Sequence, residues 1–333
     1  MDSSRHNKIS GEGVDAPASG NVNAEEGIVT FQELDCVALE NSALSLLVTR
    51  SVGPRIISLR PVGGPNLFAE LPDVTLPYPG EGVFHLWGGH RLWHAPEAKR
   101  RTYIPDDRPP TIEQGPGELR VTAPTEPETG LQKKLRITLP DAGATVVVDH
   151  TLHNRGLWPV KTAPWAITQL RPGGVALLPQ PIGPADPDGV QPNRTLVLWP
   201  YTDIRSPFIR WGNRLILIRS TPKTGPLKVG FANPRGWLAY YYHGTLFVKR
   251  AEYDDSATYF DRGSSSQCYC NPSFLELETL GPKTELAPGA SVTHREVWEV
   301  YRHYDLDLEL MEAETEPILA ELDLDATPPY LEE

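Results

Sequence analysis

Proline and glycine interrupt this sequence at short intervals from one end to the other. The 333 residues include 34 prolines and 28 glycines, in groups such as Gly63-Gly64-Pro65, Gly173-Gly174 and Pro288-Gly289. Because these groups are dispersed along the chain, they indicate many turns rather than one disordered tract. Whatever fold the chain adopts must therefore be assembled from short segments joined by frequent turns.

Between the turns, residues alternate with a period of two. Half-buried strands show this alternation, because successive side chains point to opposite faces of a sheet. The residues that share one face in four such segments are Leu44, Leu46 and Val48; Leu135, Ile137 and Leu139; Val146, Val148, His150 and Leu152; and Val292, His294, Glu296, Trp298 and Val300. We therefore predict an all-β fold, a large antiparallel β-sandwich with few short helices.

Composition divides the chain into three parts. Residues 1–28 are polar and lack periodicity, which predicts a disordered tail. Residues 29–303 carry the strand signals and form the predicted sandwich domain. Residues 304–333 are acidic and predicted to be partly helical, with an apolar stripe interrupted at Pro317. The stripe consists of Leu306, Leu310, Ile318, Leu319 and Leu322. A shorter helix is predicted around residues 96–101.

The charge balance excludes two classes of partner. Lys and Arg total 31 and Asp and Glu total 43, giving a net charge of −12. Nucleic acids and anionic membrane surfaces both require a basic face, so we expect neither as a partner. The apolar runs are shorter than the roughly 18 residues of a spanning helix, and the first residues lack the apolar stretch of a secretory signal.

The cysteines and the missing nucleotide motifs refine this picture. Cys268 and Cys270 would point to the same face of a strand, which is awkward for a mutual disulfide, and Cys36 is the only other cysteine. We expect buried thiols in a reducing, cytoplasmic compartment. The chain carries neither a dinucleotide fingerprint nor a phosphate-binding loop, so we expect no cofactor.

The densest group of functional side chains lies in residues 84–97. Trp87 and Trp93 offer flat apolar faces that suit the C–H faces of a sugar ring, and Arg91 offers hydrogen bonds to hydroxyls. Gly88-Gly89 between them would let a ligand approach the backbone. This mixture favours a ligand cleft.

Two other interpretations of the same group stay open. Its tryptophans can instead plug the core while its histidines are exposed. His85, His90, His94 and Glu97 are acceptable metal ligands, but their spacing matches no specific zinc motif, so we predict no metal site.

A second group lies near the end of the domain. If residues 274–280 form a strand, Glu276 and Glu278 project from one face of it. Two such carboxylates stay exposed, take up a proton or find an arginine, and one of them is a plausible general base. Asp261 and Arg262 lie shortly before this strand and are candidate binding residues. A solvated polar face is the alternative.

Two weaker signals complete the candidates. Trp165 and Gln169 share a strand that ends before Pro172-Gly173-Gly174. Arg55 precedes an apolar strand, where it would either clamp a ligand or neutralise a glutamate.

Several of these segments resemble galactose mutarotase-like proteins. Residues 39–44 and 51–59 resemble the first strands of that superfamily. His85-Leu86-Trp87-Gly88-Gly89 resembles the His-Leu-His-Gly-Gly segment of aldose 1-epimerases, and Leu277-Glu278-Thr279 resembles their Leu-Glu-Thr-Gln strand. The stretches at 87–93, 260–263 and 275–282 look still closer to an uncharacterised bacterial branch of the superfamily, the domain of unknown function DUF4380. The resemblance covers most of residues 30–302 and implies a supersandwich fold.

The resemblance also implies roles for particular residues. Glu278 matches the family base that deprotonates the anomeric hydroxyl of a small sugar. The two family histidines fall on Trp87 and near Pro164 or Trp165, and an indole cannot act as a general acid. His90 is therefore the proposed replacement acid, with His85 and His94 as alternatives.

Three functions follow from these assignments. The first is an aldose 1-epimerase-type isomerase in which Trp87, Trp93 and Trp165 stack on the sugar. Its binding residues would include Arg55, Arg91, Asp261, Arg262 and Glu276. The second is a non-catalytic sugar-binding domain, and the third is a structural or interaction domain that docks through its acidic C-terminal segment.

Overall fold

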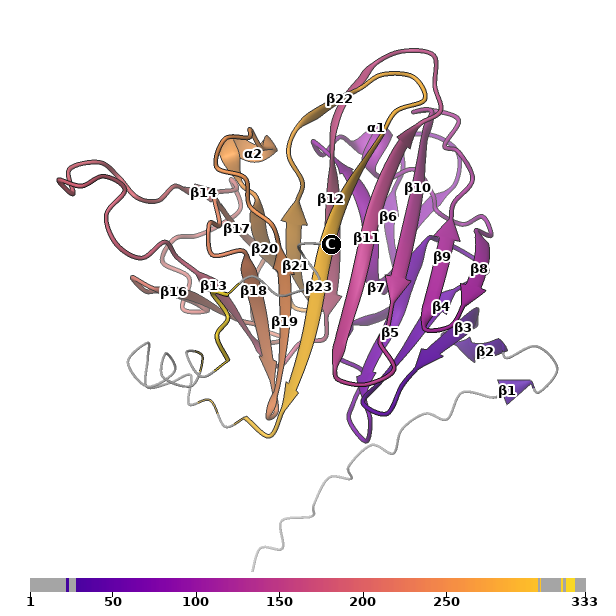
Figure 1. Cartoon of the computed structure of the whole chain (residues 1–333), viewed down its shortest axis with the longest axis horizontal. Helices are drawn as coiled ribbons and strands as arrows, with labels where there is room; N and C mark the ends of the chain where they lie inside the picture. Colours follow the sequence, from indigo (N-terminus) through magenta and orange to yellow (C-terminus); the bar gives the residue numbers. More distant parts are fainter. Residues whose placement is uncertain (1–21, 24–27, 305, 307–318, 320–321, 327–333) are drawn as a thin grey trace, which may run out of the picture.

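The computed structural model describes residues 22–23, 28–304, 306, 319 and 322–326. These residues form two antiparallel sheets, of thirteen and ten strands, that pack face to face (Figure 1). Two short helices, α1 (Lys99–Thr102) and α2 (Phe260–Gly263), lie in connections between strands. The predicted all-β sandwich with few short helices is confirmed.

The first sheet carries the candidate site. Its strands, in spatial order, are β1 (Val22–Asn23), β2 (Ile28–Phe31), β3 (Leu34–Glu40), β4 (Leu44–Thr49), β5 (Arg55–Pro61), β7 (Val83–Ala95), β12 (Val160–Leu170), β21 (Leu275–Leu280), β20 (Ser266–Cys270), β17 (Leu227–Phe231) and β14 (Leu196–Leu198). In addition, β6 (Glu70–Pro77) pairs with β7, and β22 (Thr284–Leu286) pairs with β12.

The second sheet closes the sandwich. Its strands, in spatial order, are β15 (Ile209–Trp211), β16 (Leu215–Arg219), β13 (Val175–Pro179), β18 (Trp237–Tyr242), β19 (Thr245–Ala251), β23 (Ser291–Arg302), β11 (Thr145–Asn154), β10 (Leu131–Thr138), β9 (Glu118–Thr122) and β8 (Thr111–Gly115).

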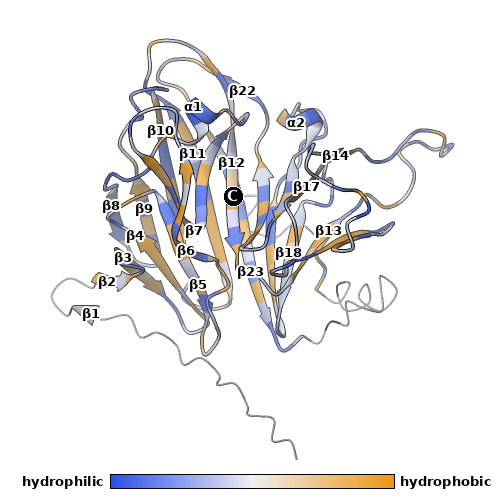
Figure 2. Cartoon of the chain, turned by 180° about the vertical axis from the view of Figure 1, so that it is seen from behind, coloured by the Kyte–Doolittle hydropathy of each residue, from blue (hydrophilic) through white to orange (hydrophobic). Residues whose placement is uncertain are grey.

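The core fills the space between the two sheets. It takes Leu46 from the first sheet and Ile137 and Trp298 from the second, all of them fully buried. Figure 2 shows hydrophobic and hydrophilic segments alternating along several strands. The residues that the period-two pattern assigned to one face are buried together as predicted, except that Val292 is half-buried.

The same alternation sets the orientation of β21, a central strand of the first sheet. Leu275 and Leu277 point into the core, so Glu276 and Glu278 point to the opposite, outer face. The predicted strand and the shared face of its two glutamates are confirmed.

The helix predictions have mixed outcomes. Helix α1 forms close to the predicted residues 96–101, whereas α2 was not predicted. Most of the helix expected near the C-terminus lies outside the described residues. Leu306 and Leu319 are described, and they pack with Leu177 and Trp237 on the second sheet, on the side away from the main core.

Other expectations concern the tail, the thiols and membrane insertion. Of the tail predicted over residues 1–28, the structure describes Val22–Asn23 as β1 and Ile28 as the start of β2; the other residues lie outside the described ranges. Cys36, Cys268 and Cys270 are all buried and free, as expected. Neither of the described helices has the length and apolar character that a membrane crossing needs.

Candidate functional site

A cleft of about 520 Å³ opens on the outer face of the first sheet, over its central strands. Val74 and Leu76 on β6, with Tyr103 after α1, form one side of the cleft. Tyr201 and Pro226 come from connections elsewhere in the chain. The remaining lining residues are Leu86, Arg91, Trp93, Glu97, Trp165, Lys228, Tyr269, Asn271, Ser273, Phe274 and Glu276.

Strand register explains why these distant residues meet. Trp93 on β7 lies opposite Trp165 on β12, and Gln169 on β12 lies opposite Glu276 on β21. Tyr269 on β20 then lies between Glu276 and Lys228 of β17. Antiparallel partners project from the same face of a sheet, so these rows bring their side chains to the cleft, with the exception of Gln169, which is buried and bonds Glu276.

Aromatic rings form the walls near Arg91. The rings of Trp93 and Trp165 meet edge to face with centroids 5.4 Å apart, and the ring of Tyr103 lies 5.4 Å from that of Trp93. The guanidinium carbon of Arg91 lies 4.5 Å from the centroid of Trp93. The predicted grouping of Arg91, Trp93 and Trp165 is therefore present in one cleft.

Glu276 is the carboxylate that opens into this cleft. Its Oε1 accepts hydrogen bonds from Gln169 Nε2 at 2.9 Å and Arg91 Nη2 at 3.3 Å, and 12% of its side chain is exposed. Burial and the negative charge of Glu278 raise the pKa of Glu276 to about 7, against the lowering effect of Arg91. Glu276 therefore titrates where a proton-transfer group works best at neutral pH.

Glu278 lies beside Glu276 but is fully buried. Its Oε2 accepts a hydrogen bond from Lys228 Nζ at 2.8 Å and another from Trp165 Nε1 at 2.8 Å. Its Oε1 has no hydrogen-bond partner among the residues that the structure describes. Burial raises the pKa of Glu278, while the Lys228 ammonium and the indole N–H oppose that rise.

Lys228 is nearly buried and is held between two indole rings. Its Nζ lies 4.9 Å from the Trp165 ring centroid and 4.8 Å from that of Trp199. Burial would lower the pKa of Lys228, but the charge of Glu278 outweighs it, so the pKa lies above its ordinary value. Lys228 is therefore a fixed positive charge at the floor of the cleft.

The Gly-Gly pair of β7 serves the fold rather than a ligand. A Cβ on Gly88 would lie 1.8 Å from the backbone oxygen of Ala69, and one on Gly89 would lie 2.3 Å from that of Ile56. Both glycines and Trp87 have positive φ, so β7 kinks here. We expected a ligand to approach this backbone, but neighbouring strands take that space.

Arg55 stabilises the kink. Its Nη1 donates to the backbone oxygens of Leu86 and Gly88, at 2.7 and 2.9 Å, and its Nη2 donates to Asp106 at 2.7 Å. The side chain is fully buried and does not line the cleft. Its partner is thus an aspartate and the backbone, rather than a ligand or a glutamate.

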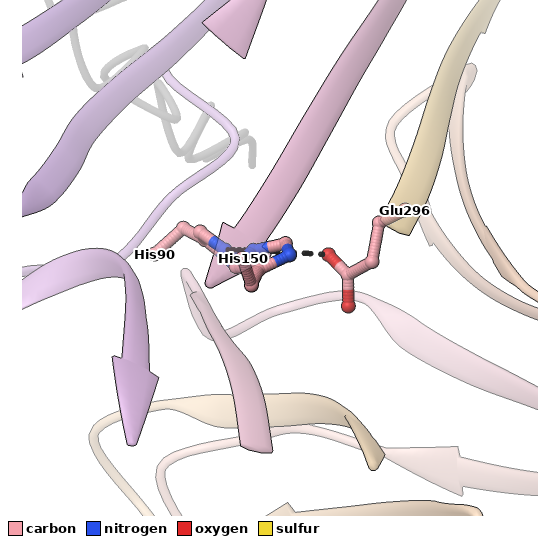
Figure 3. A group of neighbouring side chains, drawn as sticks. All are labelled: His90, His150 and Glu296. Carbon is pink, nitrogen blue, oxygen red and sulfur yellow. Dashed lines mark hydrogen bonds and ion pairs between the residues drawn. The ribbon is translucent and has the colours of Figure 1, made fainter. Parts of the chain in front are cut away.

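His90 points away from the cleft, into the space between the sheets. Its Nε2 contacts His150 Nε2 of β11 at 2.6 Å (Figure 3). Its Nδ1 contacts Thr168 Oγ1 at 2.9 Å. Burial is the main reason that the pKa of His90 is lowered. The structure does not bring His90 and Glu278 together, because they project from opposite faces of the first sheet.

His90, His150 and Glu296 form a compact group that resembles a set of metal ligands (Figure 3). However, Lys249 Nζ lies 2.9 Å from Glu296 Oε1 and 3.1 Å from Thr168 Oγ1. Lys249 supplies the positive charge that Glu296 requires, so a metal ion would have to displace a buried ammonium. This group is an ion-paired polar core, and we propose no metal there.

The other candidate metal ligands from residues 84–97 lie apart from one another. His85 stacks on Trp87 with ring centroids 4.9 Å apart, and Trp87 packs against the apolar cluster around Ile57. His94 faces Glu126, and Glu97 accepts a hydrogen bond from Tyr103. The four residues that could have formed a metal site therefore do not converge.

Besides Arg55, three further predicted binding residues lie outside the cleft. Trp87 is one of them, because the kink turns it toward Ile57. Asp261 and Arg262 form part of α2, where both have positive φ. Asp261 Oδ2 accepts a hydrogen bond from Gln267 at 2.7 Å, and Arg262 is exposed. None of the three lines the cleft.

Sequence reasoning missed Lys228 and the tyrosines Tyr103, Tyr201 and Tyr269. One signal for Lys228 was available, since it alternates with Leu227 and Val229 in a short apolar strand. Because its apolar neighbours Leu227 and Val229 point into the core, Lys228 points to the opposite face of the strand. The tyrosines carry no comparable local signal.

Comparison with known proteins supports the fold. No protein-family model matches the sequence, and no curated protein matches it. Among solved structures, a galactose mutarotase-like protein from Lactobacillus casei has a TM-score of 0.52 and 13% identity, with 80% of this chain and 100% of that chain covered. The Slr1438 protein from Synechocystis has a TM-score of 0.53 and 10% identity, with 81% and 96% covered.

A further similar structure is a TPR-domain containing protein from Parabacteroides distasonis. Its TM-score is 0.57 at 16% identity, and the alignment covers 84% of this chain. The chain spans about half the length of that protein, 49%. At these identities the likeness concerns the fold alone, which is that of the galactose mutarotase-like β-sandwich.

Proposed function

We propose that the cleft binds a small carbohydrate and catalyses proton transfer at its anomeric centre, as an aldose 1-epimerase-type isomerase does. The observation that carries this proposal is the floor of the cleft, where Glu276 and Lys228 line the surface among aromatic walls and the buried Glu278 holds the Lys228 ammonium. Ring opening needs a group that accepts the anomeric proton and another that donates to the ring oxygen. Carboxylates and an ammonium can fill both roles.

The sequence resemblance supports the same reaction. It assigns the base to Glu278, which is one member of the carboxylate pair. The walls support a sugar as the ligand, because Trp93 and Trp165 provide apolar faces while Glu276 and Arg91 provide hydrogen-bonding groups in the cleft.

The charges favour an uncharged sugar. Arg91 and Lys228 are the cationic residues that line the cleft, and each already contacts a carboxylate. A sugar phosphate would have to compete with Glu276 and Glu278 for these partners. A neutral aldose only needs hydrogen bonds, so it is the substrate class we propose.

A non-catalytic sugar-binding domain is the second candidate. It is favoured by the orientation of His90, which faces the interior, and by Trp165, which stands close to where the resemblance expects a catalytic histidine. Such a domain would use the same walls and the same ligand class.

Polarimetry or proton NMR of a freshly dissolved pure anomer of glucose or galactose separates these functions. Faster anomer exchange, lost when both glutamates are replaced by glutamine, supports the isomerase. Binding without faster exchange supports the sugar-binding domain. If no sugar binds, the third function, a structural or interaction domain, is left.

Three narrower assignments belong to the proposal. The motifs around residues 87–93, 260–263 and 275–282 support membership of the DUF4380 branch. The buried, free cysteines support a cytoplasmic protein. We further propose the domain limits 29–303, supported by strands β2–β23, which enclose one core between residues 28 and 302.

A further inference from the structure

The side chains of Glu276 and Glu278 project from the same face of β21 but lie in different environments. Glu276 lines the cleft with 12% of its side chain exposed, whereas Glu278 is fully buried and does not line it. A group that exchanges a proton with a sugar hydroxyl must come within hydrogen-bond distance of it. By this criterion Glu276 is accessible to a substrate and Glu278 is not.

Lys228 and Trp165 separate Glu278 from the cleft. Both residues line the cleft, and both donate to the same oxygen, Glu278 Oε2, at 2.8 Å. A ligand in the cleft therefore meets the Lys228 ammonium first. Glu278 acts on the ligand only through the charge and position of that ammonium.

The chain thus presents one carboxylate and one ammonium to the same ligand. Their charges interact, because Lys228 lowers the pKa of Glu276 and Glu276 raises that of Lys228. The phenols nearby are weaker candidates for the acid. The Tyr103 hydroxyl already donates its hydrogen bond to Glu97, and burial raises the pKa of Tyr201 and of Tyr269 above the ordinary value.

We propose, building on the function proposed above, that Glu276 is the base, Lys228 is the acid, and Glu278 is a positioning residue that holds the Lys228 ammonium. The Glu276 carboxylate takes the proton of the anomeric hydroxyl. The electron pair of that O–H bond forms the carbonyl at C1, and the bond between C1 and the ring oxygen breaks. The ring oxygen takes a proton from Lys228 Nζ.

The open-chain aldehyde then closes on its other face. Lys228 as neutral amine takes back the hydroxyl proton, and the carboxylic acid of Glu276 returns its proton to the new anomeric oxygen. Protons and charges balance over the cycle, and no oxidant or cofactor is consumed. The ammonium gives up its proton because the departing ring oxygen, as an alkoxide, is more basic than an amine.

The charged groups around this pair determine its pH dependence. Glu276 faces Glu278 on its own strand, Arg91 from β7 and Lys228 from β17. Lys228 faces both glutamates and, farther off, Glu97. Base catalysis by Glu276 gives an exchange rate that rises with pH through the pKa of that carboxyl. Loss of the Glu278 charge lowers the Lys228 pKa, which moves the alkaline limb of the profile to lower pH.

The test measures anomer exchange and sugar binding for the full chain and three variants. Glu276→Gln removes the base, and Lys228→Arg keeps the positive charge but holds its proton too tightly to donate it. We expect each to lower kcat by about 100-fold or more while KM changes by less than about threefold. Glu278→Gln keeps measurable exchange and shifts the alkaline limb to lower pH.

A matched control is Lys133→Arg. Lys133 is also buried and paired with a glutamate, at 2.6 Å from Glu126, but it lies outside the cleft. It should leave exchange unchanged. Thermal unfolding and sugar binding identify any variant that has lost its structure, and for such a variant the wild-type pH profile provides the test.

The outcomes separate the two levels of the proposal. If the unaltered chain does not accelerate exchange, the isomerase function is wrong. If it does accelerate exchange, three results overturn only the assignment made here: full activity in Lys228→Arg, full activity in Glu276→Gln, or a wild-type rate that does not rise with pH.

Discussion

The Nζ of Lys228 lies 2.8 Å from Glu278 Oε2, and the two indole rings of Trp165 and Trp199 flank this ion pair. Low polarity around the pair strengthens its attraction and fixes the ammonium at the floor of the cleft. A neighbouring carboxylate, Glu276, is left open to a ligand. One strand therefore supplies two glutamates with different tasks.

The Glu276 carboxyl should make stability depend on pH. An ordinary glutamate titrates near 4.5, and the folded-state pKa of Glu276 is raised to about 7. Between these values the folded protein binds more protons than the unfolded chain, so this contribution to the unfolding free energy falls as pH rises. Urea unfolding from pH 4.5 to 7.5 measures this effect. With rising pH, the unfolding free energy of Glu276→Gln should fall less, or rise more steeply, than that of the wild type. Identical pH slopes for the two proteins would contradict the raised pKa.

The Trp93 ring should contribute to sugar affinity. Replacing it with leucine removes an aromatic face beside Trp165, and aromatic contacts contribute about 1 kcal/mol, so affinity should fall about fivefold. Isothermal titration calorimetry with a neutral monosaccharide measures this. Trp158→Leu is the control, since Trp158 is 77% exposed and lies outside the cleft. Equal affinities for both variants would exclude Trp93 from the binding surface.

The buried Lys249–Glu296 pair should be essential for stability. Lys249→Met would leave the fully buried Glu296 without its cation, and breaking such a pair costs about 3–5 kcal/mol. The double variant Lys249→Met with Glu296→Gln removes both charges and should recover a large part of that loss. Chemical denaturation measures both variants. A single variant within about 1 kcal/mol of the wild type would show that the ion pair is dispensable.

The kink of β7 should depend on Gly88. A Cβ there would overlap the backbone oxygen of Ala69 at 1.8 Å, and the φ of +91° is strained for any other residue. Gly88→Ala should therefore destabilise the protein by about 3 kcal/mol or more. Gly225→Ala is the control, because a Cβ at Gly225 meets nothing within 4 Å. Equal melting temperatures for the two variants would contradict the close approach of the Gly88 backbone to the Ala69 oxygen.

Period-two alternation was sufficient to predict several of the strands and the shared face of Glu276 and Glu278, because burial of one face determines this pattern locally. It could not predict the direction of His90. At Gly88 and Gly89 the strand kinks, so Leu86 before the kink and Arg91 after it both reach the cleft despite their odd spacing. His90 consequently falls on the interior face.

The sequence also did not predict contacts between residues that only the tertiary fold brings together. Lys228 reaches the site through the register of β17 with β20, which no local pattern encodes. Arg55 was expected to clamp a ligand or neutralise a glutamate, because it precedes an apolar strand. Its partner Asp106 is 51 residues away, and no local pattern connects the two. The role of a charged residue in a strand can therefore be assigned only when its cross-strand neighbours are known.

A crystal structure of the protein with a neutral monosaccharide bound would show which residues meet the sugar. The predicted result is a sugar between the aromatic walls, with its anomeric hydroxyl within hydrogen-bond distance of Glu276 and its ring oxygen near Lys228 Nζ. A sugar that binds elsewhere on the chain, or one whose anomeric centre faces away from both residues, would contradict the account.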